Sequence, residues 1–207
     1  MLNQIRQIGV VPVVVLDDPA AAQPLADALV AGGIPAAEIT FRTAAGAAAI
    51  AEIAGREDIL VGAGTVLTPQ QVDAAADAGA RFIVSPGFSR AVVERTLDRG
   101  LLSLPGAVTA TEIQAALELG LNVVKFFPAE VSGGIKAIKA FAGPFADVSF
   151  IPTGGVSAAN LAEYLAVKQV AACGGSWMVP RDAIAGGDFA RVTQLCREAA
   201  AIVAAAR

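Results

Sequence analysis

The chain contains no histidine among its 207 residues. That absence excludes the Ser-His and Cys-His nucleophile systems and every metal site built from histidine. Acid–base chemistry must therefore come from carboxylates, lysine, tyrosine or water. Cysteine is nearly absent too: Cys173 and Cys196 form no C-x-x-C pair, and we interpret them as reduced structural thiols.

Charged residues are scarce, and no apolar run is long enough to cross a membrane. Charged residues make up 16% of the chain and hydrophobic residues 55%, which fits a large core and argues against disorder. The longest segment without Asp, Glu, Lys or Arg, residues 148–162, has 15 residues and is interrupted by proline and glycine. The net charge is −4 without runs of like charge, so we expect no nucleic-acid binding. The N-terminus lacks the features of a secretion signal, and we expect a cytoplasmic protein with no membrane partner.

Short apolar segments alternate with longer Ala-rich amphipathic segments along the whole chain. We expect eight strands: Val10–Leu16, Ala36–Phe41, Ile59–Gly62, Phe82–Ser85, Leu101–Leu104, Val123–Phe127, Val148–Pro152 and Val170–Cys173. Strands that alternate with helices predict a parallel α/β sheet with right-handed crossovers. Eight units over residues 1–207 predict a single (β/α)₈ TIM barrel, near the lower size limit of that fold. An open doubly wound sheet is the alternative, but Gly62–Thr65 lacks the third glycine of a dinucleotide-binding motif.

Several residue types mark where the helices begin and end. Asp18-Pro19, Thr68-Pro69, the capping box Thr109–Glu112 and Asp188 are predicted helix starts. Gly32, Gly79, Gly100 and Gly120 are predicted to end four helices in the left-handed conformation.

Lys125 lies within an apolar segment, residues 123–128, which is predicted to be a buried strand. A lysine there must reach solvent with its head, find a partner or lose its proton. A neutral amine is a nucleophile toward carbonyl carbon, whereas a strand-end lysine in solvent would be an ordinary surface charge. Because side chains alternate along a strand, Val123, Lys125 and Phe127 are predicted to face the barrel interior together.

The predicted second strand carries three polar residues on one face. Glu38, Thr40 and Arg42 alternate with the apolar Ile39 and Phe41, so the polar set is predicted to face the barrel interior or its mouth. Buried charges are costly unless they pair or serve a ligand, and a structural Glu38–Arg42 ion pair is one interpretation. The other interpretation places Glu38 near Lys125, where a carboxylate could move the protons that imine formation requires.

Glycine-rich segments follow the predicted third, seventh and eighth strands. Gly62–Thr65 offers backbone that a ligand can approach and a threonine hydroxyl, although an ordinary glycine turn has the same pattern. Residues 152–157 and 173–177 each combine two glycines with hydroxyl groups before a helix, which is typical of phosphate sites in barrels. Residues 85–87 and 104–106 are interpreted as having a structural role. Trp177 is interpreted as a core residue rather than a cover for the ligand.

Taken in order, these motifs resemble those of the 2-keto-3-deoxy-6-phosphogluconate (KDPG) aldolases, class I pyruvate aldolases, from about Gly9 to Arg197. The motifs are Val-Val-Pro-Val at 10–13, Glu-Ile-Thr-Phe-Arg-Thr at 38–43, Gly-Ala-Gly-Thr-Val at 62–66, Ser-Pro-Gly at 85–87, Lys-Phe-Phe-Pro-Ala-Glu at 125–130, Pro-Thr-Gly-Gly-Val at 152–156 and Gly-Gly-Ser-Trp at 174–177. One departure is Phe41, where the family pattern has leucine; it is predicted to face the helices, away from the chemistry.

The resemblance implies a homotrimeric barrel that needs neither metal nor organic cofactor and that acts on a phosphorylated 2-keto acid. It implies that Lys125 is the Schiff-base lysine and Glu38 the general acid/base. It assigns the pyruvate carboxylate to Arg42 and Thr65, the pocket walls to Pro86 and Phe127, and the phosphate end to Thr153, Gly154, Gly155, Gly175 and Ser176.

Other functions remain open at this point. The main activity could instead be on 4-hydroxy-2-oxoglutarate or on 2-keto-3-deoxy-6-phosphogalactonate, because the contacts that select the substrate are not visible in a sequence. A non-aldolase phosphosugar isomerase would share the phosphate loops but would need no inward lysine. A non-catalytic ligand-binding barrel would tolerate the loss of Glu38 or Lys125.

Overall fold

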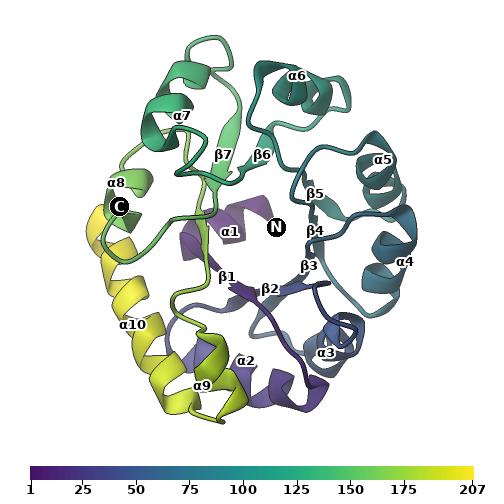
Figure 1. Ribbon diagram of the computed structural model, residues 1–207, viewed down its shortest axis with the longest axis vertical. Coiled ribbons are helices and arrows are strands. Elements are labelled where there is room, and N and C mark those ends of the chain that lie inside the picture. Colours follow the sequence, from purple (N-terminus) through teal and green to yellow (C-terminus); the bar gives the residue numbers. More distant parts are fainter.

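The structure is a computed structural model that describes residues 1–207. Its strands are β1 (Val10–Val14), β2 (Ala36–Thr40), β3 (Leu60–Gly64), β4 (Phe82–Val84), β5 (Leu102–Leu104), β6 (Val123–Phe126), β7 (Ser149–Pro152) and β8 (Cys173–Gly175). Six of them pair in the order β5-β4-β3-β2-β1-β8, and β6 pairs with β7. Single bridges from Gly106 to Lys125 and from Thr153 to Gly174 join the two groups. All pairs are parallel, and the ring of strands is the predicted (β/α)₈ barrel (Figure 1).

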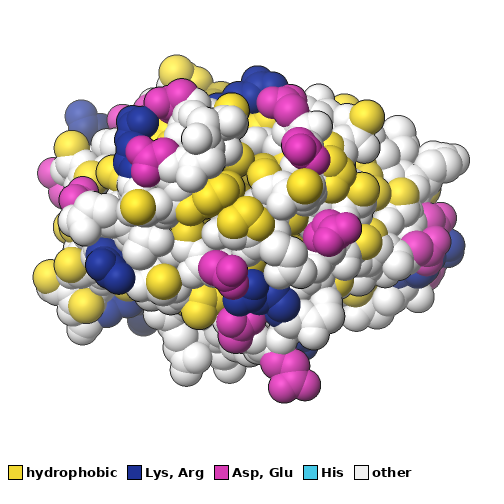
Figure 2. All heavy atoms as spheres, turned by 90° about the horizontal axis from the view of Figure 1, so that it is seen from below, with side chains coloured by type: hydrophobic (Ala, Val, Ile, Leu, Met, Phe, Trp, Pro, Cys, Tyr) yellow, Lys and Arg dark blue, Asp and Glu magenta, His cyan; other side chains and the backbone are white.

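The helices surround this ring, except that the first one crosses its amino end (Figure 1). They are α1 (Leu2–Ile8), the 3₁₀ helix η1 (Pro19–Ala21), α2 (Ala22–Ala31), α3 (Gly46–Ile53), α4 (Pro69–Asp77), α5 (Arg90–Asp98), α6 (Ala110–Glu118), α7 (Gly134–Ala142), α8 (Leu161–Leu165), α9 (Arg181–Ala185) and α10 (Phe189–Ala206). None of them combines the length and the apolar character that crossing a membrane would require. On the side that carries α2, α3 and α9, acidic and basic side chains are interspersed with hydrophobic ones (Figure 2).

Side-chain alternation divides the core into two layers. Outward-facing residues such as Ile39, Val124 and Phe126 pack against the helices. Inward-facing residues such as Val11, Phe82 and Ile151 fill the barrel, and Ile5 of α1 closes its amino end. Because Lys125 lies between Val124 and Phe126 on β6, its side chain must point into the barrel.

Several predicted strand boundaries were wrong by one to three residues, and two of these errors involve glycine. We expected the eighth strand at residues 170–173, but β8 comprises Cys173–Gly175, paired with β1 from Val10 to Pro12. β3 likewise runs through Gly62 and Gly64 instead of ending at Gly62. Glycine is disfavoured in strands on average, but the barrel needs it where a large neighbouring side chain fills the interior.

Most of the predicted helix boundaries are confirmed. Thr68 and Asp188 accept hydrogen bonds from backbone N–H groups of the first turn, and Thr109 and Glu112 form the predicted capping box. Asp18 caps the short helix η1. The left-handed glycines at 79, 100 and 120 are also confirmed.

The prediction for Gly32 was wrong by one position. Gly32 has φ −84°, and Gly33 takes the left-handed conformation with φ 79°. Either of two adjacent glycines can adopt this conformation, so the residue type alone does not show which of them ends the helix.

Candidate active site

Lys125 and Glu38 meet in the interior of the barrel, from strands that stand opposite each other in the ring. The Nζ atom of Lys125 donates a hydrogen bond to Oε1 of Glu38 at 3.1 Å. Their side chains are only 7% and 5% exposed. The interpretation of Lys125 as a surface charge was therefore wrong. A buried ion pair contributes little to stability, because both charges lose their hydration, so its presence favours a functional role.

Space for the Glu38 carboxylate is provided by Gly64. A Cβ atom at Gly64 would lie 2.2 Å from Oε1 of Glu38, a distance that no real contact allows. Gly62 makes the same kind of space for the ring of Phe82. We had interpreted these glycines as backbone that a ligand could approach, but here their missing side chains accommodate neighbouring side chains.

The remaining polar residues of the second strand have separate roles. Thr40 is buried and its hydroxyl donates a hydrogen bond to the backbone oxygen of Val14 at 2.8 Å. Arg42 lies just beyond the end of β2, is exposed and takes part in no ion pair, so the alternative of a Glu38–Arg42 pair was wrong. The Arg42 guanidinium therefore remains available to a ligand.

A cavity of about 280 Å³ opens above the ion pair at the carboxyl end of the strands. Seven of the residues predicted to bind substrate line it: Arg42, Phe127, Thr153, Gly154, Gly155, Gly175 and Ser176. The Nζ atom of Lys125 lies 5.3 Å from the centre of the Phe127 ring, which places the amine near the cavity wall. Lys125 and Glu38 do not themselves line the cavity, but Phe127 lies between the amine and the predicted phosphate end.

Beneath the ion pair the barrel is almost solid. The space left there is about 10 Å³, bounded by Glu38, Lys125, Thr153 and apolar side chains such as Phe82 and Leu104. A site of this size holds at most about one water molecule. Thr153 lines both this space and the 280 Å³ cavity, so the carboxyl-end cavity lies next to the ion pair.

Thr65 and Pro86 do not line the 280 Å³ cavity at the carboxyl end, although they follow β3 and β4 at the same end of the barrel. Thr65 has a positive φ of 57°, which is rare for a β-branched residue. Such backbone strain is concentrated at functional sites, which supports the predicted role of Thr65.

Two residues that the sequence analysis did not single out hold the glycine loop after β7. Gly154 and Gly155 have φ values of 92° and 84°, and a Cβ atom at Gly155 would lie 2.3 Å from Cγ of Glu130. The hydroxyl of the buried Tyr164 donates a hydrogen bond to Glu130. Burial, with this hydrogen bond, raises the pKa of Tyr164, so it stays a donor at neutral pH. The nearby motif 125–130 contained Glu130, but nothing in the sequence linked it to Tyr164.

The cysteines and the tryptophan lie outside the chemistry. Cys173 and Cys196 are free and buried, and burial raises the pKa of each thiol to about 12. Both remain protonated at neutral pH, as we expected for structural thiols. Trp177 packs against the outer core, as predicted, with its ring beside Gly175.

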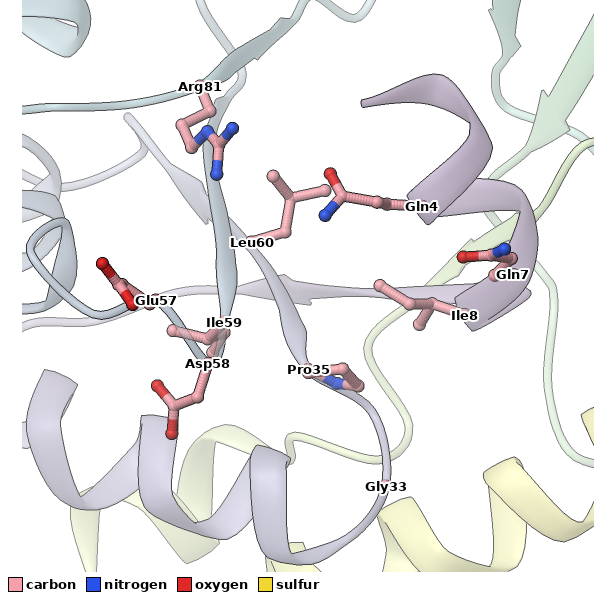
Figure 3. A pocket seen from close by; sticks show the side chains of 10 residues that line it. All are labelled: Gln4, Gln7, Ile8, Gly33, Pro35, Glu57, Asp58, Ile59, Leu60 and Arg81. Atoms are coloured by element: carbon pink, nitrogen blue, oxygen red, sulfur yellow. The ribbon is translucent and has the colours of Figure 1, made fainter.

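The largest cavity is a different one, at the amino end of the barrel, with a volume of about 390 Å³ (Figure 3). Its wall includes Gln4 and Gln7 of α1, Leu60 at the start of β3, and Arg81 just before β4. Figure 3 shows Glu57 and Asp58 pointing away from α1. No buried ionisable side chain lines this cavity.

Comparison with known proteins gives a consistent result over nearly the whole chain. The family model for KDPG and KHG aldolase matches residues 1–195. The chain is 52% identical over 204 residues to the 2-dehydro-3-deoxy-phosphogluconate aldolase of Treponema pallidum, covering 98% of this chain and 97% of that protein. It is 47% identical over 191 residues to the KHG/KDPG aldolase of Escherichia coli K12, covering 92% and 90%. The crystal structure of the KDPG aldolase from Legionella pneumophila, with pyruvate captured as a covalent carbinolamine intermediate, has a TM-score of 0.91 at 40% identity and covers 95% and 97%.

Proposed function

Because the chain belongs to the KDPG and KHG aldolase family, we infer that it is a lyase that cleaves 2-keto-3-deoxy-6-phosphogluconate into pyruvate and glyceraldehyde 3-phosphate. We assign this function to Lys125 and Glu38 because their Nζ and Oε1 atoms form a buried contact of 3.1 Å. An amine and a carboxylate in contact, away from water and next to the carboxyl-end cavity, are the two groups that an imine-forming aldolase needs.

Lys125 is the nucleophile in this proposal. An ammonium group has no free electron pair, so Nζ must first give up a proton, and Oε1 of Glu38 is within reach to take it. The free amine then attacks C2 of the keto acid to form a carbinolamine. Glu38 then returns its proton to the departing hydroxyl of the carbinolamine. Loss of water gives a protonated imine, which can accept the electron pair of the C3–C4 bond, and it leaves Glu38 as a carboxylate again.

Glu38 transfers the protons in the following steps. Its carboxylate, directly or through a water molecule, takes the proton of the C4 hydroxyl as the C3–C4 bond breaks. The bonding electrons move into the imine to give an enamine, and glyceraldehyde 3-phosphate departs. A proton added at C3 restores the imine, and water at C2 releases pyruvate and the free amine of Lys125.

The cavity provides separate places for the two charged ends of the substrate. Arg42, which has no partner in the protein, binds the carboxylate together with Thr65 in this proposal. The glycine loops after β7 and β8, with Thr153 and Ser176, offer backbone N–H groups and hydroxyls to the phosphate. Pro86 and Phe127 are proposed to form apolar walls between these ends.

Borohydride trapping tests the assignment of the nucleophile. Reduction in the presence of pyruvate is expected to label Lys125, found by mass spectrometry of its peptide, and to inactivate the enzyme. Lys125→Met should abolish both labelling and cleavage, because the thioether cannot form an imine. The exposed Lys168 is the matched control, and Lys168→Met should leave both unchanged. Label on another lysine, or near-normal turnover of Lys125→Met, would exclude the mechanism. Cleavage without trapping would instead favour a barrel that does not use an imine.

The range of substrates is a second question. The relative from Escherichia coli K12 is named KHG/KDPG aldolase, and we propose that this chain also cleaves 4-hydroxy-2-oxoglutarate, with a lower kcat/KM because that molecule lacks the phosphate. A comparison of kcat/KM for the two substrates and for the galactonate-derived epimer measures this preference.

We propose a single barrel domain over residues 1–207 that assembles as a homotrimer in the cytoplasm. The homotrimer is what the resemblance to the family implies. Both cysteines are unpaired, as is usual in a reducing compartment. Sedimentation equilibrium should give a mass three times the 20.8 kDa of one chain.

A further inference from the structure

Arg181 lines the carboxyl-end cavity, and neither the sequence motifs nor the family resemblance gives it a role. It begins α9, directly after the segment that follows β8, and borders the same space as Gly155, Gly175 and Ser176. Among the residues that line this cavity, only Arg42 and Arg181 are charged, and both are cations. No carboxylate lines the cavity itself, so none there repels a negatively charged ligand.

Asp17, in the segment after β1, holds the Arg181 side chain at the cavity rim. Nη2 of Arg181 lies 2.7 Å and 2.8 Å from the two carboxylate oxygens of Asp17, and Nε lies 3.2 Å from Oδ2. Nη1 takes part in none of these bonds. A guanidinium has five N–H donors, so Arg181 can bind a further anion through Nη1 while it keeps Asp17.

This ion pair is exposed, with side-chain exposures of 63% for Arg181 and 59% for Asp17. Exposed ion pairs contribute little to stability, because water solvates both charges well when they are not paired. The contact with Asp17 is therefore weak, and its adjustment toward a bound phosphate costs little. The pair orients Arg181 without making it unavailable.

We propose that Arg181 is a further phosphate-binding residue and that it increases the preference for phosphorylated over unphosphorylated 2-keto acids. This inference rests on the proposed function, because it assigns a subsite of the same cavity. The two cations would then serve the two charged ends of the substrate, with Arg42 after β2 for the carboxylate and Arg181 after β8 for the phosphate. Arginine suits this task because its planar fork matches phosphate oxygens.

The alternative is a purely structural pair that ties α9 to the segment after β1. The two roles differ in which substrate is affected. A structural role would change the kinetics for all substrates together, or change only the melting temperature. A phosphate contact changes KM for the phosphorylated substrate alone.

The test compares Arg181→Ala with the wild type on KDPG and on 4-hydroxy-2-oxoglutarate. Loss of one charge-assisted contact should raise KM for KDPG roughly tenfold to a hundredfold. We expect little change in kcat for KDPG and no change in KM for the unphosphorylated substrate. Arg181→Lys should recover part of the affinity, since it keeps the charge but not the fork. Inorganic phosphate should inhibit the wild type competitively and Arg181→Ala much more weakly.

Arg191 provides the matched control. It forms an exposed pair with Asp182 of α9, with Nη1 of Arg191 2.8 Å from Oδ2 of Asp182, but it does not line the cavity. Arg191→Ala should leave both substrates and phosphate inhibition unchanged. An unchanged KM for KDPG in Arg181→Ala, or an equal rise for both substrates, would overturn the inference and leave the aldolase function intact. A wild type that cleaves neither substrate would instead refute the proposed function, and the Arg181 assignment with it.

Discussion

The two ends of the barrel are formed by the same strands but hold different kinds of side chain. The carboxyl end has the smaller cavity, about 280 Å³, with two cations at its rim and the buried Lys125–Glu38 pair beneath it. The amino end has the larger cavity, about 390 Å³, lined by exposed groups of both charges and floored by Leu60. The comparison shows that cavity volume alone does not locate an active site. We place the proposed site where the fold brings buried ionisable groups together.

The largest difference in effect on kcat between the two ends is expected when the Glu38 carboxylate is replaced by an amide. Glu38→Gln removes the proton acceptor while it keeps the shape of the side chain, and kcat should fall by about 10²–10⁴. Borohydride should still trap some imine with pyruvate, because the amine of Lys125 remains. The same change at Glu57, which lines the amino-end cavity, is the control and should leave kcat unchanged. Equal losses from both variants would contradict the distinction between the ends.

A core change at the amino end should affect stability rather than chemistry. Ile5 of α1 is fully buried in the barrel interior, and Ile5→Ala should lower the free energy of unfolding by about 2–5 kcal/mol. Gln7→Ala, on an exposed position of the same helix, should change it by less than about 0.5 kcal/mol. Urea unfolding measures both. If folded Ile5→Ala lost its activity selectively, the amino end would have a part in the reaction that we do not assign to it.

The smallest effect is expected at Arg81, the cation of the amino-end cavity. Arg81 is exposed and forms no ion pair, so Arg81→Ala should leave KM for KDPG unchanged and alter stability by less than about 0.5 kcal/mol. Arg181→Ala is the contrasting variant at the other end. A raised KM in the Arg81 variant would show that a cation in either cavity can influence the substrate.

The features that follow from short-range patterns could be predicted from the sequence. The strand and helix alternation indicated the barrel, and the alternation of side chains along β2 and β6 indicated that Glu38 and Lys125 both face inward. Their meeting follows because two interior side chains at the carboxyl end of one narrow barrel have little room to avoid each other. The helix caps depend on adjacent residues only, and for that reason most of them were also predictable.

Features that depend on contacts between distant residues could not be predicted. The position of β8 depends on its pairing with β1, and the roles of Gly62 and Gly64 depend on the side chains of Phe82 and Glu38. Nothing in a linear pattern indicates that Tyr164 supports Glu130 or that Asp17 reaches Arg181 across the fold. The helix α1 was not predicted either. Its buried residue Ile5 packs into the amino end of the barrel, and that packing site exists only once the strands have closed into a ring.

The interior of the barrel next to Lys125 is almost completely filled, so the barrel is not a channel that is open at both ends. With about 10 Å³ of free space below the amine, no molecule larger than water can pass through toward the amino end. Both products must leave by the route along which the substrate arrived. In the proposed mechanism the three-carbon piece is still bonded to Lys125 when the aldehyde phosphate is already free, so the aldehyde phosphate is expected to leave first. In that mechanism the order of release follows from the covalent bond and from the single route out, and not from the relative affinities of the two products.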